Sequence, residues 1–389
     1  MIKRDMTKKL KQIASKFSVL AVLGPRQSGK TTLVNSVFKK HKYVLLEDLD
    51  VIEMAESDPR GFLEMHHNKE GIIFDEIQNV PSLFSYIKTY VDENKKPGYF
   101  VLTGSQNFLL NQAISQTLAG RIFLFTLLPL SINEMEKGKV LPAKIEEAIF
   151  YGCYPRIYDE KIAPVDWYPG YIRTYLERDV RQIKNVTNLT TFQRFVKLCA
   201  GRTGQLVNLS SLGNDCGIST STAKAWLTLL EASYIVFLLQ PHFRNFSKRL
   251  VKSPKMYFYD TGLACSLLGI TSVEQIDSHY LRGGLFESYI ISDLMKKFYN
   301  KGIEPPLYFW RDKIGREVDC IIQDGQDLTP IEIKAGKTIT QSYFSGLDYW
   351  NSISGGDPEN SYVIYAGDQV QKRIKSNVIG WKKLPKYFE

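Results

Sequence analysis

A glycine-rich segment between residues 24 and 31 constrains this chain more than any other feature. The segment Gly24-Pro-Arg-Gln-Ser-Gly29-Lys30-Thr31 matches GxxxxGK[ST] in full. It directly follows an apolar run, residues 17–23, which fits the strand that the motif requires. Its glycines let backbone N–H groups close around phosphates at a helix N-terminus, where the helix dipole favours anions. The sequence therefore predicts a nucleotide-binding loop within an α/β fold.

The residue types of this loop assign a role to each of its reactive side chains. Lys30 is expected to reach the β and γ phosphates, and the Thr31 hydroxyl is expected to ligate Mg²⁺. We therefore expect ATP and Mg²⁺ as cofactors. The other residues that we expect to contact the nucleotide are Gly24, Gln27, Ser28, Gly29 and Thr32.

Two acidic residues end another apolar segment, Gly71-Ile-Ile-Phe-Asp75-Glu76. Asp75 is expected to hold Mg²⁺ through water. Glu76 is placed to orient and deprotonate the attacking water as a general base. An acidic residue beside the metal-holding carboxylate suits hydrolysis better than phosphoryl transfer to a small molecule. An exposed acidic strand end is the plainer alternative, which the complete phosphate loop disfavours.

Two more residues are candidates for contacts to the γ-phosphate. Ser105 follows an apolar strand and is predicted to sense this phosphate, with Thr103 as the alternative and a turn role equally open. Arg121 precedes the next strand and is predicted to serve a neighbouring subunit as an arginine finger. That role would make the working unit a homo-oligomer. A surface salt bridge is the alternative for Arg121.

The pattern of apolar and polar residues changes along the chain. Residues 1–130 alternate short apolar runs with amphipathic segments, which predicts a parallel sheet covered on both faces. Residues 131–200 are helical in pattern and predict a lid. Residues 201–270 predict two helices joined by a tight turn at Gly217, followed by a basic wing and a strand, as in a winged helix-turn-helix. A core helical pair is the alternative. The wing would carry Arg244, Lys248, Arg249, Lys252 and Lys255, while Lys224 and Trp226 could face DNA.

Residues 271–389 place acidic residues and a lysine on neighbouring elements. Asp319 and Glu332 lie on apolar strands separated by a polar turn, so a hairpin would bring their side chains together. The period of two along a strand puts Glu332 and Lys334 on one face. The pattern predicts a metal held by Asp319 and Glu332, with Lys334 polarising a phosphate or a water molecule.

The order of these motifs resembles that of the AAA family ATPases that carry a C-terminal domain of unknown function. The resemblance rests on the phosphate loop, the Asp-Glu strand, Thr103-Gly-Ser-Gln and Leu118-Ala-Gly-Arg, and it continues in Tyr151-Gly-Cys-Tyr-Pro155 and Tyr257-Phe-Tyr-Asp260. Cys153 stands where we would expect a second glycine. The resemblance covers essentially the whole chain and implies ATP binding and an AAA-like fold.

The C-terminal cluster resembles the PD-(D/E)xK core of restriction-like endonucleases. In this resemblance Glu287, on a predicted helix, takes the accessory position and joins the metal ligands Asp319 and Glu332. It implies a restriction-endonuclease-like α/β domain. A fold of this type that has lost its activity is the alternative, because a fold can persist without its chemistry.

Composition sets the remaining expectations. The formal net charge of +9 suits nucleic acid, although a solvated basic surface explains each patch equally well. The 5 cysteines are scattered without ligand spacing, so we expect reduced thiols and no zinc. No apolar stretch approaches the roughly 20 residues that span a bilayer, so we expect a cytoplasmic protein.

Taken together, these patterns favour a Mg²⁺-dependent ATPase that associates with double-stranded DNA and is coupled to a metal-dependent nuclease. The alternative is a regulatory nucleotide switch that binds a protein partner and carries an inactive nuclease-like domain.

Overall fold

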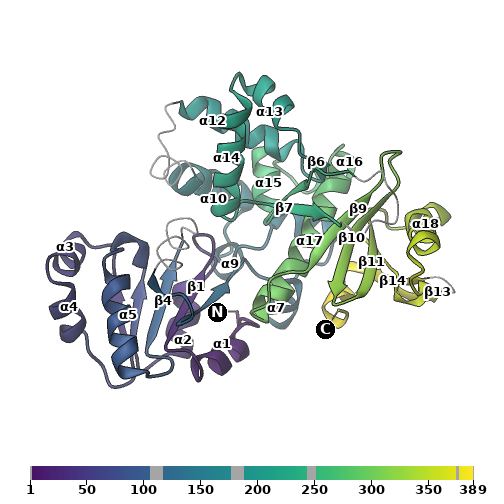
Figure 1. Cartoon of the computed structure of the whole chain (residues 1–389). Helices are drawn as coiled ribbons and strands as arrows, with labels where there is room; N and C mark the ends of the chain where they lie inside the picture. Colours follow the sequence, from purple (N-terminus) through teal and green to yellow (C-terminus); the bar gives the residue numbers. More distant parts are fainter. Residues whose placement is uncertain (1, 106–116, 177–187, 243–250, 374–375, 389) are drawn as a thin grey trace. The chain divides into compact units, whose positions relative to one another are not determined.

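The computed structural model describes residues 2–105, 117–176, 188–242, 251–373 and 376–388 (Figure 1). The chain forms two compact units. The first contains residues 1–130, 232–234 and 296–304, and the second contains residues 131–231, 235–295 and 305–389. No described helix is long and apolar enough to cross a membrane.

The first unit contains a five-stranded sheet in the order β2-β3-β4-β1-β5. All of its strand pairs are parallel, as the alternating pattern predicted. Strand β1, which lies between β4 and β5, is buried along its whole length because its sequence is apolar throughout. The strands are β1 (Val19–Leu23), β2 (Lys42–Leu45), β3 (Ile72–Asp75), β4 (Phe100–Gly104) and β5 (Ile122–Thr126).

Helices cover both faces of this sheet (Figure 1). Side chains of β1 alternate between two hydrophobic clusters: Ala21 packs with residues of α5, and Val22 packs with residues of α1 and α2. The alternation follows from the period of two along a strand. The helices of this unit are α1 (Thr7–Ala14), α2 (Lys30–Val37), α3 (Leu49–Ser57), α4 (Pro59–Met65) and α5 (Leu83–Asn94), with a short 3-10 turn η1 (Ile77–Asn79).

The second unit begins with helices, as its sequence pattern predicted. They are α7 (Ile132–Lys137), α8 (Ile145–Tyr151), α9 (Pro155–Asp159), α10 (Pro164–Tyr171), the π-helical turn η2 (Ile172–Leu176) and α12 (Leu189–Ala200). The next elements along the chain are β6 (Gln205–Leu206), α13 (Leu209–Cys216), α14 (Thr220–Ala232), β7 (Val236–Pro241) and β8 (Lys255–Phe258).

The turn between α13 and α14 contains Gly217 at φ 71°, the left-handed conformation for which glycine was predicted. Trp226 of α14 is buried between the rings of Phe192 and Phe195. Its environment therefore agrees with the alternative, a core helical pair. Lys224 on the same helix is exposed.

The prediction of a basic wing is wrong for its last residue, Lys255. Lys255 is buried in β8, where its ammonium pairs with Glu317 and Glu287. The segment 251–254 lies in the described chain and Lys252 is exposed. The other predicted wing residues, Arg244, Lys248 and Arg249, lie outside the described residues.

A nine-stranded sheet crosses the second unit in the order β13-β14-β12-β11-β10-β9-β7-β8-β6. Strands β7 and β9 pair in parallel, so the sheet continues across the boundary expected between residues 270 and 271. The remaining strands are β9 (Leu307–Arg311), β10 (Glu317–Asp324), β11 (Asp327–Lys334), β12 (Tyr362–Tyr365), β13 (Val370–Arg373) and β14 (Ser376–Gly380).

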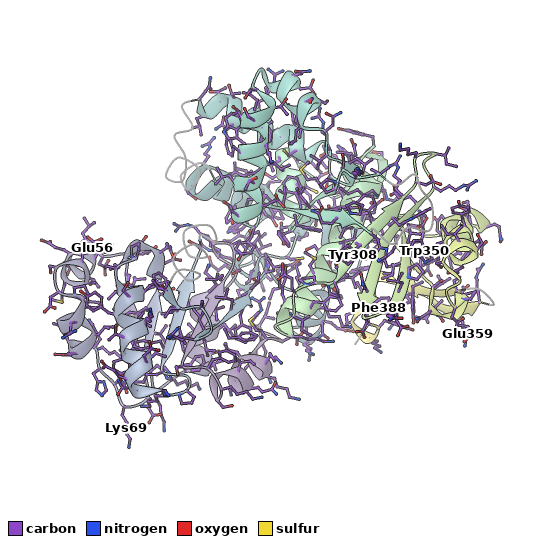
Figure 2. All side chains as sticks on the ribbon, viewed as in Figure 1. Glu56, Lys69, Tyr308, Trp350, Glu359 and Phe388 are labelled. Carbon is purple, nitrogen blue, oxygen red and sulfur yellow. The ribbon has the colours of Figure 1, made fainter. Side chains whose placement is uncertain are left out.

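Helices and aromatic side chains complete this unit. Trp350 of α18, labelled in Figure 2, packs edge to face against Trp310 of β9 with ring centroids 5.5 Å apart. The remaining elements are α15 (Thr261–Leu267), α16 (Glu274–Ser278), α17 (Arg282–Asn300), α18 (Ser345–Ser354) and the 3-10 turns η3 (Gln341–Phe344), η4 (Pro358–Asn360) and η5 (Trp381–Lys386). The last turns of α17, from residue 296, belong to the first unit.

Candidate functional site

The phosphate loop connects β1 to α2 at the carboxyl edge of the first sheet. Gly24 begins the loop, and a Cβ at this position would lie 2.1 Å from the Leu127 carbonyl oxygen. Gly29 caps α2 at φ 92°, a left-handed conformation that a side chain would strain. Gln27 adopts φ 61° within the loop. Both motif glycines are therefore required by the backbone path itself.

Lys30 is buried within the loop that it follows. Its Nζ donates hydrogen bonds to the carbonyl oxygens of Gly24 and Pro25, each at 3.0 Å. The side chain is 5% exposed, so its charge lies inside the loop rather than in solvent. This arrangement places one cation where phosphate oxygens are expected to bind.

Asp75 ends β3 and is held by hydroxyl groups from three other elements. Its Oδ2 accepts hydrogen bonds from Thr31 Oγ1 and from the Tyr43 hydroxyl, each at 2.7 Å. Its Oδ1 accepts a further hydrogen bond from Thr103. The structure therefore brings together Asp75 and Thr31, the two residues predicted to hold Mg²⁺.

Tyr43 was not identified from the sequence. Burial and the hydrogen bond to Asp75 raise the pKa of Tyr43 above its ordinary value, so the hydroxyl remains a donor at neutral pH. One carboxylate and one hydroxyl are a sufficient protein contribution for Mg²⁺, which takes its remaining ligands from water and nucleotide phosphates. Asp75 and Thr31 thus fit the expected ion.

Glu76 has an unusual backbone conformation directly after Asp75. Its φ of 56° and ψ of 46° are left-handed, which costs free energy for a residue other than glycine and is common at functional sites. Its Oε2 accepts hydrogen bonds from Ser105 Oγ at 2.9 Å and from the Gln78 amide. Ser105, predicted as the phosphate sensor, therefore contacts the predicted general base, and Gln78 was not foreseen.

Arg121 lies at the opposite edge of the sheet from the loop. It precedes Ile122, which pairs with Val19 at the start of β1, whereas the loop follows the end of that strand. The two ends of β1 are four residues apart, which corresponds to about 13 Å along the strand. The Arg121 guanidinium pairs with Asp92 of α5, with Nη2 3.0 Å from Oδ2. The structure shows the surface salt bridge, and the role on a second subunit stays a prediction.

The predicted C-terminal residues also come together. Cys320 of β10 pairs with Ile331 of β11, so the hairpin sets Asp319 beside Glu332 as expected. Lys334 Nζ lies 2.9 Å from Glu332 Oε1 and 3.4 Å from Asp319 Oδ2. The Ile333 N–H also donates to Asp319 Oδ2, at 2.8 Å.

Glu287 of α17 belongs to the same cluster. Three further members, Tyr257, Lys255 and Glu317, were not predicted from the sequence to lie there. The Oε2 of Glu287 accepts a hydrogen bond from the Tyr257 hydroxyl at 3.0 Å and lies 3.7 Å from Lys255 Nζ. Lys255 also pairs with Glu317. The only sequence signal was the spacing of Lys255 and Tyr257, which puts both on one face of β8.

Burial dominates the electrostatics of this cluster. Burial, followed by the charge of Asp319, raises the pKa of both Glu287 and Glu332 above the ordinary range. Glu332 Oε2 is buried without a hydrogen-bond partner. Within the described ranges, no group of three His, Cys, Asp or Glu side chains is arranged to hold a metal ion. Lys334 instead contacts both carboxylates of the hairpin.

A family model matches the part of the chain that contains the first of these sites. Residues 16–136 match the AAA domain, which covers the loop, Asp75, Glu76 and Ser105. The first unit therefore contains an AAA-type P-loop domain. Residues 142–274 and 282–384 match two domains of unknown function, DUF8612 and DUF4143. These descriptions name no activity, so the winged-helix and nuclease-like assignments stay predictions.

Two curated relatives match most of the chain. Uncharacterized proteins from Mycobacterium tuberculosis and Mycobacterium bovis are each 29% identical to this chain over 348 residues, which is 89% of this chain and 77% of theirs. Among solved structures, a Walker-type ATPase of Pyrococcus abyssi matches with a TM-score of 0.46 and 15% identity, over 68% of this chain and 94% of that chain.

Proposed function

We propose that the first unit binds ATP with Mg²⁺ and hydrolyses it. The observation that carries the proposal is the connected set of hydrogen bonds at the carboxyl edge of the sheet. Thr31 of the loop donates to Asp75, and Ser105 donates to Glu76 one residue further along. A phosphate-binding loop, a metal-holding carboxylate and a second, separately held carboxylate are the parts that nucleotide hydrolysis requires.

Each residue has a distinct task in this proposal. Lys30 exchanges its hydrogen bonds to the loop carbonyls for phosphate oxygens. Thr31 and Asp75 would hold Mg²⁺, which neutralises charge on the phosphates when bound. Glu76 accepts the proton of the attacking water, and its hydrogen bond from Ser105 fixes the carboxylate for that transfer.

Substitution of Lys30 tests this proposal at the phosphate loop. The wild type should hydrolyse ATP only when Mg²⁺ is present. In Lys30→Ala, turnover should fall by about a hundredfold or more, because a charged donor to the transferring phosphate is lost. The assay is phosphate release over a range of ATP and Mg²⁺ concentrations.

Lys39→Ala is the matched control, since Lys39 is exposed just beyond α2. It should retain wild-type turnover. Equal rates for Lys30→Ala and the wild type would contradict the proposal, as would wild-type phosphate release that persists with a chelator.

A specific observation favours a second candidate function in the other unit. The buried Glu332 Oε2 has no hydrogen-bond partner, although Asp319 and Lys334 lie beside it. A buried carboxylate oxygen without a hydrogen-bond partner is costly, and either a proton or a bound cation can offset that cost. We propose that Asp319 and Glu332 hold a divalent metal once Lys334, which contacts both carboxylates, moves to the phosphate of a DNA substrate, with Glu287 in the accessory position. The net charge of +9 favours a polyanion as substrate.

Plasmid cleavage tests this second function. With Mg²⁺ or Mn²⁺, supercoiled DNA should be nicked by the wild type and left intact by Asp319→Asn and Lys334→Met. Asp324→Asn is the control, because Asp324 is exposed at the end of the same strand. Cleavage that survives in Asp319→Asn would contradict the assignment.

Intact DNA in every reaction would favour the alternative class of protein, a nucleotide switch that binds a protein partner. In that class the C-terminal carboxylates and lysines would be a buried ion-pair network. The lid predicted for residues 131–200 is proposed to respond to ATP in either class, since this segment directly follows residues 1–130 of the first unit along the chain.

A further inference from the structure

Arg4 lies against the phosphate loop although it precedes the loop by 20 residues or more. The side chain is 7% exposed. Its Nη1 donates to the Ser28 carbonyl oxygen and its Nη2 donates to the Leu128 carbonyl oxygen, each at 2.6 Å. Hydrogen bonds from a charged donor at this length are among the stronger ones in proteins. One guanidinium therefore joins the loop to the segment after β5.

The bond to Ser28 controls a group that a nucleotide would contact. The Ser28 carbonyl and the Gly29 N–H belong to one planar trans peptide, so they point in opposite directions. Arg4 holds the carbonyl, and the Gly29 N–H must therefore point away from Arg4. Gly29 is the N-cap of α2, the end of a helix at which N–H groups bind anions.

The Ser28–Gly29 peptide needs a hydrogen bond from outside the loop to fix its orientation. Gly29 has no side chain and can adopt many backbone conformations, so the peptide before it is free to rotate. A rotated peptide would present a carbonyl oxygen to the phosphates. A buried carbonyl without a donor is also unfavourable, and Ser28 is fully buried. The Arg4 guanidinium fixes the orientation of the peptide and also supplies a donor to its carbonyl oxygen.

The position of Arg4 is itself fixed by its neighbours. Met6 and Leu10 are fully buried and pack in one hydrophobic cluster with Leu33 and Val34 of α2. The main chain of residues 4–10 is therefore anchored to the helix that the loop begins. Thr7 adds a hydrogen bond from its hydroxyl to the Arg4 carbonyl oxygen at 2.7 Å.

We propose that Arg4 is a positioning residue that keeps the phosphate loop in the conformation that binds nucleotide phosphates. The inference rests on the proposed ATP site and adds a residue from outside the motif to it. Arg4 does not contact the nucleotide in this account. It acts through the Ser28–Gly29 peptide, so its loss should weaken binding more than it slows the chemical step.

Steady-state ATP hydrolysis by three variants tests the proposal. In Arg4→Gln, the KM for ATP should rise by about tenfold or more, while kcat stays within about threefold of wild type. Arg4→Lys keeps the charge but lacks the fork that reaches two carbonyls, and its KM should be intermediate. Lys8→Gln, which changes an exposed residue of α1, should leave KM unchanged.

A melting curve separates this role from a purely structural one. Arg4→Gln with a lowered Tm and a wild-type KM would overturn the inference. If Arg4→Gln fails to fold, Arg4→Lys decides, because a wild-type KM in that variant would equally overturn it. These outcomes leave the ATPase proposal intact, since the wild type would still hydrolyse ATP. Failure of the wild type to bind ATP by calorimetry would instead overturn the ATPase proposal and this inference with it.

Discussion

At the scale of single residues, the hydrogen bonds around Asp75 show how far motif spacing can predict a site. The sequence identified Asp75 and Thr31 correctly as neighbours, because the loop and a strand-ending carboxylate have a fixed relation in a parallel sheet. It did not identify Tyr43, whose hydroxyl also reaches Asp75. Tyr43 lies on β2, and the pairing of β2 with β3 cannot be read from spacing.

Thr103 offers a residue-scale prediction. Its hydroxyl donates to Asp75 and lies 3.4 Å from the Glu76 N–H, so it touches both carboxylate-bearing residues. Thr103→Val keeps the shape but removes these hydrogen bonds. We expect kcat for ATP hydrolysis to fall about tenfold, with little change in KM, because two groups used in the transition state lose alignment.

The measurement is steady-state kinetics beside Thr89→Val, which alters an exposed threonine of α5. A kcat for Thr103→Val equal to that of the control would show that Asp75 and Glu76 do not depend on Thr103.

Lys255 is the residue on which sequence reasoning was wrong. Its neighbours in the chain are basic, so it was assigned to an exposed wing. The structure buries it beside Glu317 and Glu287, which follow it by more than 30 residues and come from other elements. A cation is buried when carboxylates from elsewhere in the chain neutralise it, and local charge patterns do not contain that information.

At the scale of elements, the strands of the first sheet could be predicted closely. Buried parallel strands are continuous apolar runs, and β1 and β3 have that form. The turn between α13 and α14 was predictable because only the glycine at 217 suits its backbone. Strand β13 was missed, since its residues 370–373 are mostly polar and exposed.

The continuity of the second sheet was also unpredictable. Strands β7 and β9 pair through only two residue pairs, Gln240 with Tyr308 and Pro241 with Phe309. Such a pairing joins segments more than 60 residues apart and leaves no periodic signal in either strand. The sequence therefore predicted a domain boundary between residues 270 and 271, although strands from both sides of it form one sheet.

At the scale of the whole molecule, each candidate site is contained in one compact unit. The loop, Asp75, Glu76, Ser105 and Arg4 all lie in the first unit. The cluster around Asp319 lies in the second. Each chemistry can therefore be tested by itself, because among the described residues neither site includes a residue of the other unit.

In the proposed reaction, Glu76 performs the proton transfer of ATP hydrolysis while the loop binds the nucleotide. Single-turnover hydrolysis and ATP affinity, measured on the wild type and Glu76→Gln, test it most directly. We predict an ATP affinity within about threefold of wild type and a turnover rate lower by about a hundredfold or more, the usual contribution of a general base. A Glu76→Gln protein that hydrolyses bound ATP at the wild-type rate would contradict the account.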